Sequence, residues 1–310
     1  MARPTSGRQN VTRSTSGRRR WLLPFVLLSA LALLLGACGS DSDDDASDTT
    51  EAGAEGGDGG DIVKAGFIFI GPINDGGWTQ AHNVGREEAA AALEGKAELV
   101  YKENIPEGPE ATQAMQTMID DGAKIIFANS FGYGEAMKEL AAENPDWVFL
   151  YQYGNEANPR AHYETTGPEI WADAPEITHF VAGLGTSGTL LGVGTYLKER
   201  NPDVSILAVE PPSGELVEGL RSLEDGYIPP VFEKWGGYEL LDGKSIVRPR
   251  ESLEYTRKLA GIGIFAGISS GAALAGACKV AGRIESGTIV FIVCDYGWKY
   301  LSTGAWTVDL

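Results

Sequence analysis

A glycine- and hydroxyl-rich loop, Gly183–Thr189, most constrains what this chain can fold into. The loop follows an apolar run, Thr178–Ala182, and precedes a helical pattern that continues to about Arg200. A second apolar run, Val204–Val209, comes next. A strand, a tight loop, a helix and another strand form a βαβ unit, in which the strands are parallel and the ligand lies at their carboxyl ends. The sequence therefore predicts an α/β fold with a ligand site at this loop.

The loop suits more than one anionic ligand. Its glycines fit the G-x-G-x-x-G pattern of dinucleotide sites, with an acidic residue, Glu210, about 20 residues further on. Thr186, Ser187 and Thr189 add three hydroxyl groups to the backbone N–H groups at the start of the helix. Several hydroxyls suit the oxygens of a compact phosphate monoester better than a pyrophosphate that crosses bare glycine. We expect a phosphate monoester, and a dinucleotide or a loop that binds nothing are the alternatives.

The segment Gly267–Gly271 spells G-x-S-x-G, a motif of serine hydrolases. In that fold the nucleophilic Ser precedes the acidic residue and the His of its triad. The last His of this chain is His179, upstream of Ser269, so chain order excludes a hydrolase. Ser269 is expected instead at the start of a helix, where its hydroxyl caps the helix or bonds a heterocycle nitrogen.

Apolar runs and helical patterns also alternate in the first half of the chain. The expected strands span 62–70, 97–101, 123–128 and 147–153, and the expected helices span 78–93, 110–119 and 134–142. This alternation predicts a parallel sheet with helices on both faces and a ligand at the carboxyl ends of the strands.

Two loops at these strand ends, Gly71–Trp78 and Asn129–Tyr133, place polar side chains beside aromatic ones. Amide and carboxylate groups next to an aromatic face suit a ligand that contains a sugar and a base. The run Asn-Asp-Gly-Gly is also good turn chemistry. A purely structural role for both loops therefore stays open.

The first sixty residues have the pattern of an exported lipoprotein. Three Arg precede Trp21–Ala37, an apolar run that is short for a membrane span and typical of an export signal. The run ends Leu-Gly-Ala-Cys38, which resembles the lipobox of bacterial lipoproteins. That resemblance implies lipidation of Cys38 and attachment to the outer face of a membrane, with an uncleaved anchor as the alternative. Residues 39–61 hold nine acidic residues and no basic one, which predicts a disordered tether.

Charge and cysteine content exclude several classes of protein. The net charge is -18, although residues 1–37 contain six Arg and no acidic residue. The rest of the chain is too acidic to bind nucleic acid, which requires clustered Lys and Arg. Three Cys and three His without zinc-ligand spacing predict neither a metal site nor a disulfide framework.

Residues 64–149 resemble the first lobe of the basic-membrane-protein family, the substrate-binding lipoproteins of ABC transporters that take purine nucleosides or similar small ligands. The similar stretches are GFIFIGPINDGGWTQAHNVGR, ENIPEG, IIFANSFGYGEAM and ENPDWVF. The resemblance implies a periplasmic-binding-protein-like lobe in which Asp75, Trp78 and Phe131 face the ligand. The resemblance stops near Phe149. Proteins of this family close two lobes around a ligand, and the resemblance does not include the second lobe.

Residues 151–306 resemble cysteine synthase, the fold-type-II enzyme that uses pyridoxal 5'-phosphate (PLP), and in particular its B-type, phosphoserine-using branch. The similar stretches are QYGNEANPRAHYETTGPEIW, ITHFVAGLGTSGTLLGVG, VEPPSGELVEGLRSLEDGYIPP, GIFAGISSGAAL and DYGWKYLSTGA. The resemblance implies that Ser269 lies at the pyridine nitrogen and Arg221 at the substrate phosphate, with a solvated helix charge as the alternative for Arg221. It implies that the PLP phosphate is held by Gly185, Thr186, Ser187, Gly188 and Thr189.

The lysine that binds PLP covalently in this family lies upstream of the matched region. No Ser/Thr-x-Lys-Asp-Arg-like segment occurs in residues 62–150, so no catalytic residue is assigned. The expected reaction replaces the leaving group of O-phosphoserine or O-acetylserine with a sulfur donor. Without the lysine we expect PLP to bind non-covalently at best, and this activity to be absent or very weak.

Three hypotheses follow. The first is a chimera joined near residues 149–151, which explains why both resemblances stop at one point. Its segments are a signal peptide (1–37), an acidic tether (38–61), a partial binding lobe (62–150) and a partial PLP domain (151–310). The second is a working PLP enzyme with a new lysine or a partner chain. The third is an ABC-transporter lipoprotein that binds a purine nucleoside or another small ligand and has borrowed an α/β domain as its second lobe. A homodimer is a further expectation, because cysteine synthases are dimers.

Overall fold

The computed structural model describes residues 62–309 of the chain. Two parallel β-sheets form the framework of these residues. The expected signal peptide, the acidic tether and Cys38 lie outside the described residues. Within residues 62–309, no helix is both long enough and apolar enough to cross a bilayer.

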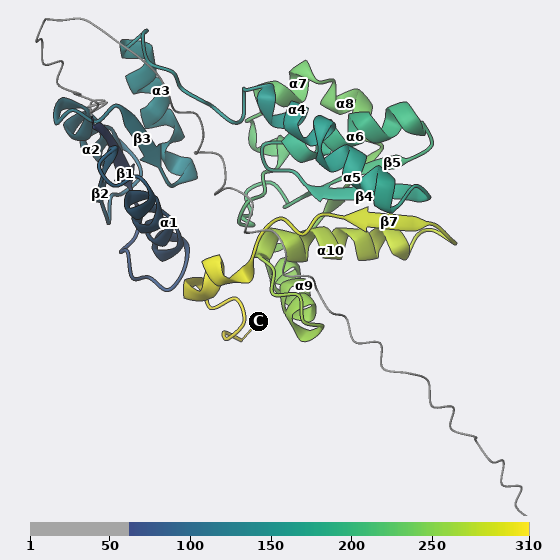
Figure 1. The fold of residues 1–310 in the computed structure, drawn as a ribbon. Coiled ribbons are helices and arrows are strands. Elements are labelled where there is room, and N and C mark those ends of the chain that lie inside the picture. Colours follow the sequence, from purple (N-terminus) through teal and green to yellow (C-terminus); the bar gives the residue numbers. More distant parts are fainter. Residues whose placement is uncertain (1–61, 310) are drawn as a thin grey trace, which may run out of the picture. The chain divides into compact units, whose positions relative to one another are not determined.

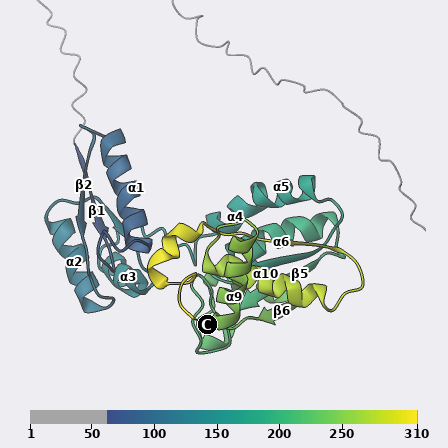
Figure 2. The same cartoon turned by 90° about the horizontal axis from the view of Figure 1, so that it is seen from below.

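The first sheet has three strands in the order β2-β1-β3 (Figure 1). Its elements in chain order are β1 (Val63–Ile68), α1 (Trp78–Ala92), β2 (Ala97–Lys102), α2 (Pro109–Asp120), β3 (Ile125–Ala128), the short 3-10 turn η1 (Phe131–Tyr133) and α3 (Gly134–Glu143). In the register of the sheet, Val63 lies opposite Ala97, and Ala65 lies opposite Ile125. Helices α1 and α2 lie on opposite sides of the strands (Figure 2).

The two faces of the first sheet are packed differently. On the α2 and α3 side, a buried cluster includes Ile68, Met115 and Tyr133, and the Tyr133 hydroxyl donates to the carbonyl oxygen of Ile105 at 2.6 Å. On the other side, α1 buries only two polar residues completely, and Phe127 of β3 stays 45% exposed. Most of the apolar burial in this part of the chain therefore comes from α2 and α3.

The second sheet has four parallel strands in the order β6-β5-β4-β7. Its elements in chain order are α4 (Ala157–Glu164), α5 (Thr166–Asp173), β4 (Ile177–Gly183), α6 (Gly188–Arg200), β5 (Ser205–Glu210), η2 (Leu223–Asp225), α7 (Pro230–Lys234), α8 (Gly237–Leu240), β6 (Gly243–Ile246), α9 (Pro249–Gly261), α10 (Ile268–Ala281), β7 (Thr288–Phe291) and η3 (Gly297–Thr303). Helices α4, α5 and α6 lie on one side of this sheet, and α9 and α10 lie on the other (Figure 1).

Each face of the second sheet has its own buried core, because successive side chains of a strand point to opposite faces. Phe180 of β4 packs with Leu190 and Leu191 on the α6 side. The next residue, Val181, packs with Ala272 of α10 on the other side. A sheet covered on both faces leaves the carboxyl ends of its strands as the place for a ligand.

The expected strand 147–153 is absent from the structure, so that prediction was wrong. Val148 is 83% exposed, Leu150 is 73% exposed, and the backbone turns where the N–H of Gly154 bonds the carbonyl oxygen of Tyr151 at 3.0 Å. A strand forms only where an edge pairs with it, and here aromatic rings stack on one another instead, as Phe149 and Tyr151 do at 5.2 Å. The other expected strands and helices are confirmed, with shifts at their ends.

Candidate cofactor site

The loop Gly183–Thr189 joins the carboxyl end of β4 to the first turn of α6, as the sequence predicts. Ser187 adopts a left-handed conformation, with φ 70° and ψ -6°, which is uncommon outside glycine. The side chain of the N-cap residue, Ser187, bonds no N–H group of α6, although the N–H of Gly188 bonds the hydroxyl of Thr186. The N–H groups that follow Gly188 and the helix dipole together attract an anion to this position.

The hydroxyl groups of Thr186 and Ser187 are hydrogen-bonded within the loop region. Thr186 Oγ1 accepts from Nδ2 of Asn158 at 3.0 Å and from the N–H of Gly188 at 3.2 Å. Ser187 Oγ donates to the carbonyl oxygen of Thr186. These bonds fix the loop conformation before any ligand arrives, which reduces the entropy lost on binding.

The hydroxyl of Thr189 contacts a histidine. His162 of α4 lies between two hydroxyls, with Nε2 at 3.2 Å from Thr189 Oγ1 and Nδ1 at 3.0 Å from Thr166 Oγ1. Burial lowers the pKa of His162 below its ordinary value. The imidazole is therefore neutral at neutral pH.

The segment 217–221, which follows β5, lies directly against this loop. A Cβ atom on Gly185 would lie 2.6 Å from the carbonyl oxygen of Gly219, so only glycine fits there. A Cβ atom on Gly219 would lie 3.5 Å from Cβ of Ser269, the buried residue in the first turn of α10. The structure thus brings the predicted phosphate loop and Ser269 together through this segment.

Arg221 lies beside Phe131, although the sequence assigned these residues to two different ligands. The guanidinium carbon is 3.6 Å from the ring centroid, and Nη1 donates to the carbonyl oxygen of Leu220 at 3.1 Å. Nε is buried and has no hydrogen-bond partner within residues 62–309. A buried guanidinium N–H without a partner favours an anionic acceptor next to it.

Asp75 caps a helix in this structure. Its Oδ1 accepts from the N–H groups of Gly77 at 2.8 Å and Gln80 at 2.9 Å, and Oδ2 accepts from the N–H of Thr79 at 3.1 Å. Both carboxylate oxygens therefore satisfy the first N–H groups of α1. The geometry supports the turn interpretation of this loop over a carboxylate that faces a ligand.

Trp78 links the carboxyl ends of β1 and β3. Its Nε1 donates to the carbonyl oxygen of Asn129 at 2.8 Å, and its ring centroid is 4.4 Å from that of His82. Lys299 Nζ lies 5.7 Å from the same ring. One edge of this indole is thus occupied by the protein's own backbone.

A charged cluster that the sequence did not predict lies close to the start of α10. Lys299 Nζ is 2.8 Å from Oδ2 of Asp295, and the Tyr300 hydroxyl donates to the same oxygen at 2.8 Å. The backbone carbonyl of Asp295 accepts from the N–H of Gly267 at 2.9 Å. Burial raises the pKa of Tyr300, which keeps its hydroxyl protonated as a donor. These residues belong to the stretch DYGWKYLSTGA, which was the available signal.

Glu210, the acidic residue of the dinucleotide pattern, is fully buried. Its Oε1 is 2.6 Å from Nζ of Lys244 on the neighbouring strand, and its Oε2 accepts from the N–H of Leu223 at 3.1 Å. A carboxylate engaged in this way is closed to the hydroxyls of a ribose. The geometry therefore disfavours a dinucleotide.

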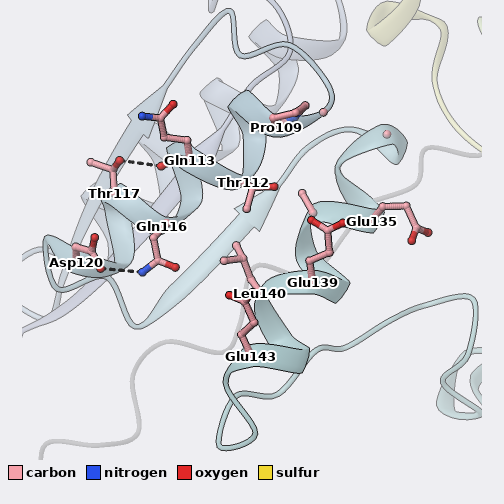
Figure 3. A pocket seen from close by; sticks show the side chains of 13 residues that line it. Pro109, Thr112, Gln113, Gln116, Thr117, Asp120, Glu135, Glu139, Leu140 and Glu143 are labelled. Carbon is pink, nitrogen blue, oxygen red and sulfur yellow. Dashed lines mark hydrogen bonds between the residues drawn. The ribbon is translucent and has the colours of Figure 1, made fainter.

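A separate cavity of about 760 Å³ lies between α2 and α3 (Figure 3). Four of the described residues that line it are acidic and none is basic. The acidic ones are Asp120, Glu135, Glu139 and Glu143. Such a surface repels a phosphate group. None of the predicted site residues lines this cavity, so we separate it from the cofactor site.

Comparison with known proteins assigns the family. Residues 83–295 match the family described as "Pyridoxal-phosphate dependent enzyme". The chain belongs to this family. Cysteine synthase B of Escherichia coli (strain K12) is 37% identical over 220 residues, 69% of this chain and 70% of the relative. Cysteine synthase of Helicobacter pylori is 35% identical over 238 residues, 72% and 75% of the two chains.

Solved structures agree with this assignment. The O-acetylserine dependent cystathionine beta-synthase from Helicobacter pylori is 31% identical, with a TM-score of 0.54 over 78% of each chain. The α/β fold with parallel sheets, typical of fold-type-II PLP enzymes, and PLP as the cofactor are thereby confirmed. The residues described above fit PLP, because the start of α6 offers the N–H groups that follow Gly188 to its phosphate and the buried Ser269 hydroxyl can bond a ring nitrogen.

The family match begins at Asn83, within α1. It therefore covers much of the segment 64–149, which the sequence analysis assigned to a transport lipoprotein. That assignment remains a proposal.

The capping role of Asp75 predicts a specific stability change. D75A should lower the free energy of unfolding by about 0.5–2 kcal/mol, because the first N–H groups of α1 lose their acceptor. D75N should lose less, since an amide oxygen also caps. Urea unfolding measures both variants, and a D75A chain as stable as the wild type would contradict the capping role.

Two half-buried histidines predict how stability depends on pH. Burial lowers the pKa of His162 and His82 below the ordinary value of 6.5, so near pH 6 the unfolded chain binds more protons than the folded one. The free energy of unfolding should therefore decrease as the pH is lowered from about 7.5 to about 5.5. H162Q should show a smaller fall, measured by urea unfolding at both pH values. An unchanged pH dependence in H162Q would refute this role.

Proposed function

We propose that the chain is a cysteine-synthase-like protein that holds PLP at the loop Gly183–Thr189 and at Ser269. The proposed reaction class is replacement at Cβ of an activated serine by a sulfur donor. The observation that carries the proposal is the contact between Gly185 and Gly219, because it places the loop, the segment 217–221 and Ser269 next to one another. The relatives named cysteine synthase B support the same class.

We propose O-phosphoserine as the activated serine, with O-acetylserine as the alternative. Support comes from Arg221, whose buried Nε has no hydrogen-bond partner within the described residues. A phosphate dianion would supply the missing acceptor, and a charge-assisted bond of this kind is about twice as strong as a neutral one. An acetyl group brings no charge to this position.

The residues of this chain have distinct roles in the proposed site. PLP, when bound, supplies an electron sink for the carbanion at Cα of an amino acid. The N–H groups at the start of α6 and the hydroxyls of Thr186, Ser187 and Thr189 would hold its phosphate. The hydroxyl of Ser269 would orient the ring through its nitrogen without a formal charge, since Ser both donates and accepts.

We further propose that no lysine binds the cofactor covalently, so that turnover is absent or very weak. The segment upstream of residue 151 has no Ser/Thr-x-Lys-Asp-Arg-like sequence. In that segment Lys138 donates to Glu135 at 2.7 Å, and this hydrogen bond raises the pKa of the lysine. A protonated lysine is a poor nucleophile.

Domain organisation and location remain proposals. We propose a signal peptide at 1–37, a tether at 38–61 and a lipid on Cys38 that attaches the protein to a membrane. We also propose folded units at 62–150 and 151–310, and a homodimer. The proposal of a chimeric origin rests on the two sequence resemblances, which meet near residues 149–151. The family match from Asn83 onward counts against that origin.

A binding and trapping experiment tests the main proposal. Wild-type protein should bind PLP in a spectroscopic titration, whereas G185A should bind at least about 10-fold more weakly, because its Cβ displaces the segment that faces the loop. After borohydride reduction and dialysis, the bound PLP should be lost. A stable reduced adduct on one lysine, mapped by mass spectrometry, would overturn non-covalent binding. Absence of PLP binding by the wild type would overturn the proposed function.

A second candidate function is binding of a purine nucleoside by residues 62–150. Support comes from Trp78 and Phe131, two aromatic residues at the carboxyl ends of β1 and β3, and from the buried Nδ2 of Asn129, which has no hydrogen-bond partner in the described chain.

Equilibrium dialysis with labelled purine nucleosides tests this candidate. The wild type should bind a purine nucleoside with a micromolar dissociation constant. N129A should bind it at least about 10-fold more weakly, because a buried hydrogen bond to the ligand is removed. D75N is the comparison variant and should bind as the wild type does, since the wild-type Asp75 carboxylate caps α1 instead of facing a ligand. Failure of the wild type to bind any purine nucleoside would remove this candidate.

A further inference from the structure

We infer that the ion pair between Glu210 and Lys244 is the positioning element that holds the segment of Arg221 against the cofactor loop. The inference rests on the proposed PLP site and adds two residues to it. Neither residue touches the proposed ligands. They act through the chain segment 217–224, which forms one wall of the site.

The pair lies at the carboxyl edge of the second sheet. Glu210 is the last residue of β5 and has no exposed surface, while Lys244 belongs to β6. In the register of the sheet, Ala208 lies opposite Lys244, and Glu210 is two residues further along. The two side chains therefore share one face of the sheet, and the ammonium and carboxylate groups approach to 2.6 Å.

Glu210 holds the segment through a backbone hydrogen bond. Its Oε2 accepts from the N–H of Leu223 at 3.1 Å, at the start of η2. Lys244 Nζ lies 3.8 Å from Oε1 of Glu224, the next residue. The pair thus fixes Leu223 and Glu224, which end the segment 217–224 that contains Arg221.

The fixed segment contacts the loop at three points. The N–H of Arg221 donates to the carbonyl oxygen of Leu184 at 2.7 Å. The side chain of Leu220 covers Gly183, and the carbonyl oxygen of Gly219 closes against Gly185. A shift of the segment would therefore change both the phosphate loop and the position of the guanidinium group.

The charge state of the pair makes this arrangement sensitive to a single substitution. A fully buried carboxylate without its cation carries a large desolvation cost. In K244M the contact to Glu224 is gone, and a Glu210 carboxylate that turns toward water also gives up the N–H of Leu223. Removing Lys244 alone should therefore displace the segment, whereas removing both charges should not.

Hydrogen exchange on the full-length protein without added cofactor tests the anchor directly. In K244M the amides of residues 217–225 should exchange at least about 10-fold faster than in the wild type, as the local opening free energy falls. The double variant E210Q/K244M should stay within about 3-fold of the wild type, because the amide oxygen still accepts from Leu223.

A matched control separates this effect from the loss of any ion pair. Lys279 Nζ pairs with Oε2 of Glu251 at 2.7 Å, and its side chain is 32% exposed, against 34% for Lys244. K279M should leave exchange in 217–225 unchanged. Equal acceleration in K279M and K244M, or no acceleration in K244M, would overturn the inference.

The variant E210L/K244M keeps the test decisive if K244M fails to fold. It carries no buried charge but has no acceptor for the N–H of Leu223, so residues 217–225 should again exchange faster than in E210Q/K244M. Equal exchange rates in the two double variants would contradict the anchor.

PLP titration gives the second readout. K244M should bind PLP about 10- to 100-fold more weakly than the wild type, the scale on which a displacement of about 1 Å acts. Restoration in E210Q/K244M supports a positioning role. If the wild type binds no PLP, the proposed function fails, while hydrogen exchange still decides the anchor. Weaker binding in K244M without faster exchange would overturn the anchor.

Discussion

The candidate site depends on one backbone contact, between Gly185 and the carbonyl oxygen of Gly219. Parallel strands end at a common edge, so the loops that follow β4 and β5 must share the same space there. Any side chain at residue 185 would separate them. With hydrogen at that position, the two loops pack against each other, and Gly219 also lies next to Ser269 at the start of α10.

The sequence predicted those helices and strands whose bounds are set by residues close together in the chain. The boundaries of β4 and α6 follow from an apolar run, a glycine loop and a helical pattern, all within one stretch of sequence. The strand expected at 147–153 failed for the opposite reason: alternating apolar residues form a strand only if an edge accepts them. Val148 and Leu150 are exposed because no strand edge accepts this segment, and its composition alone does not reveal whether such an edge exists.

The site was predictable as a set of residues but only in part as a set of contacts. Glycines and hydroxyls marked the loop, and Asn-Asp-Gly-Gly correctly suggested a turn at Asp75. The meeting of Arg221 with Phe131 joins residues 90 positions apart in the chain, and no local pattern encodes it. The cluster of Lys299, Asp295 and Tyr300 was hidden for the same reason, since its link to α10 exists only in the folded chain.

The buried pair at the end of β5 also restricts how this sequence can change over generations. A mutation that neutralises Lys244 first would pass through a form with an isolated buried anion. A mutation of Glu210 to Gln first leaves only a partly exposed cation, which water can solvate. Two positions that contact no ligand are thus linked in a fixed order of replacement, and descendants that lose both charges should lose the acidic one first.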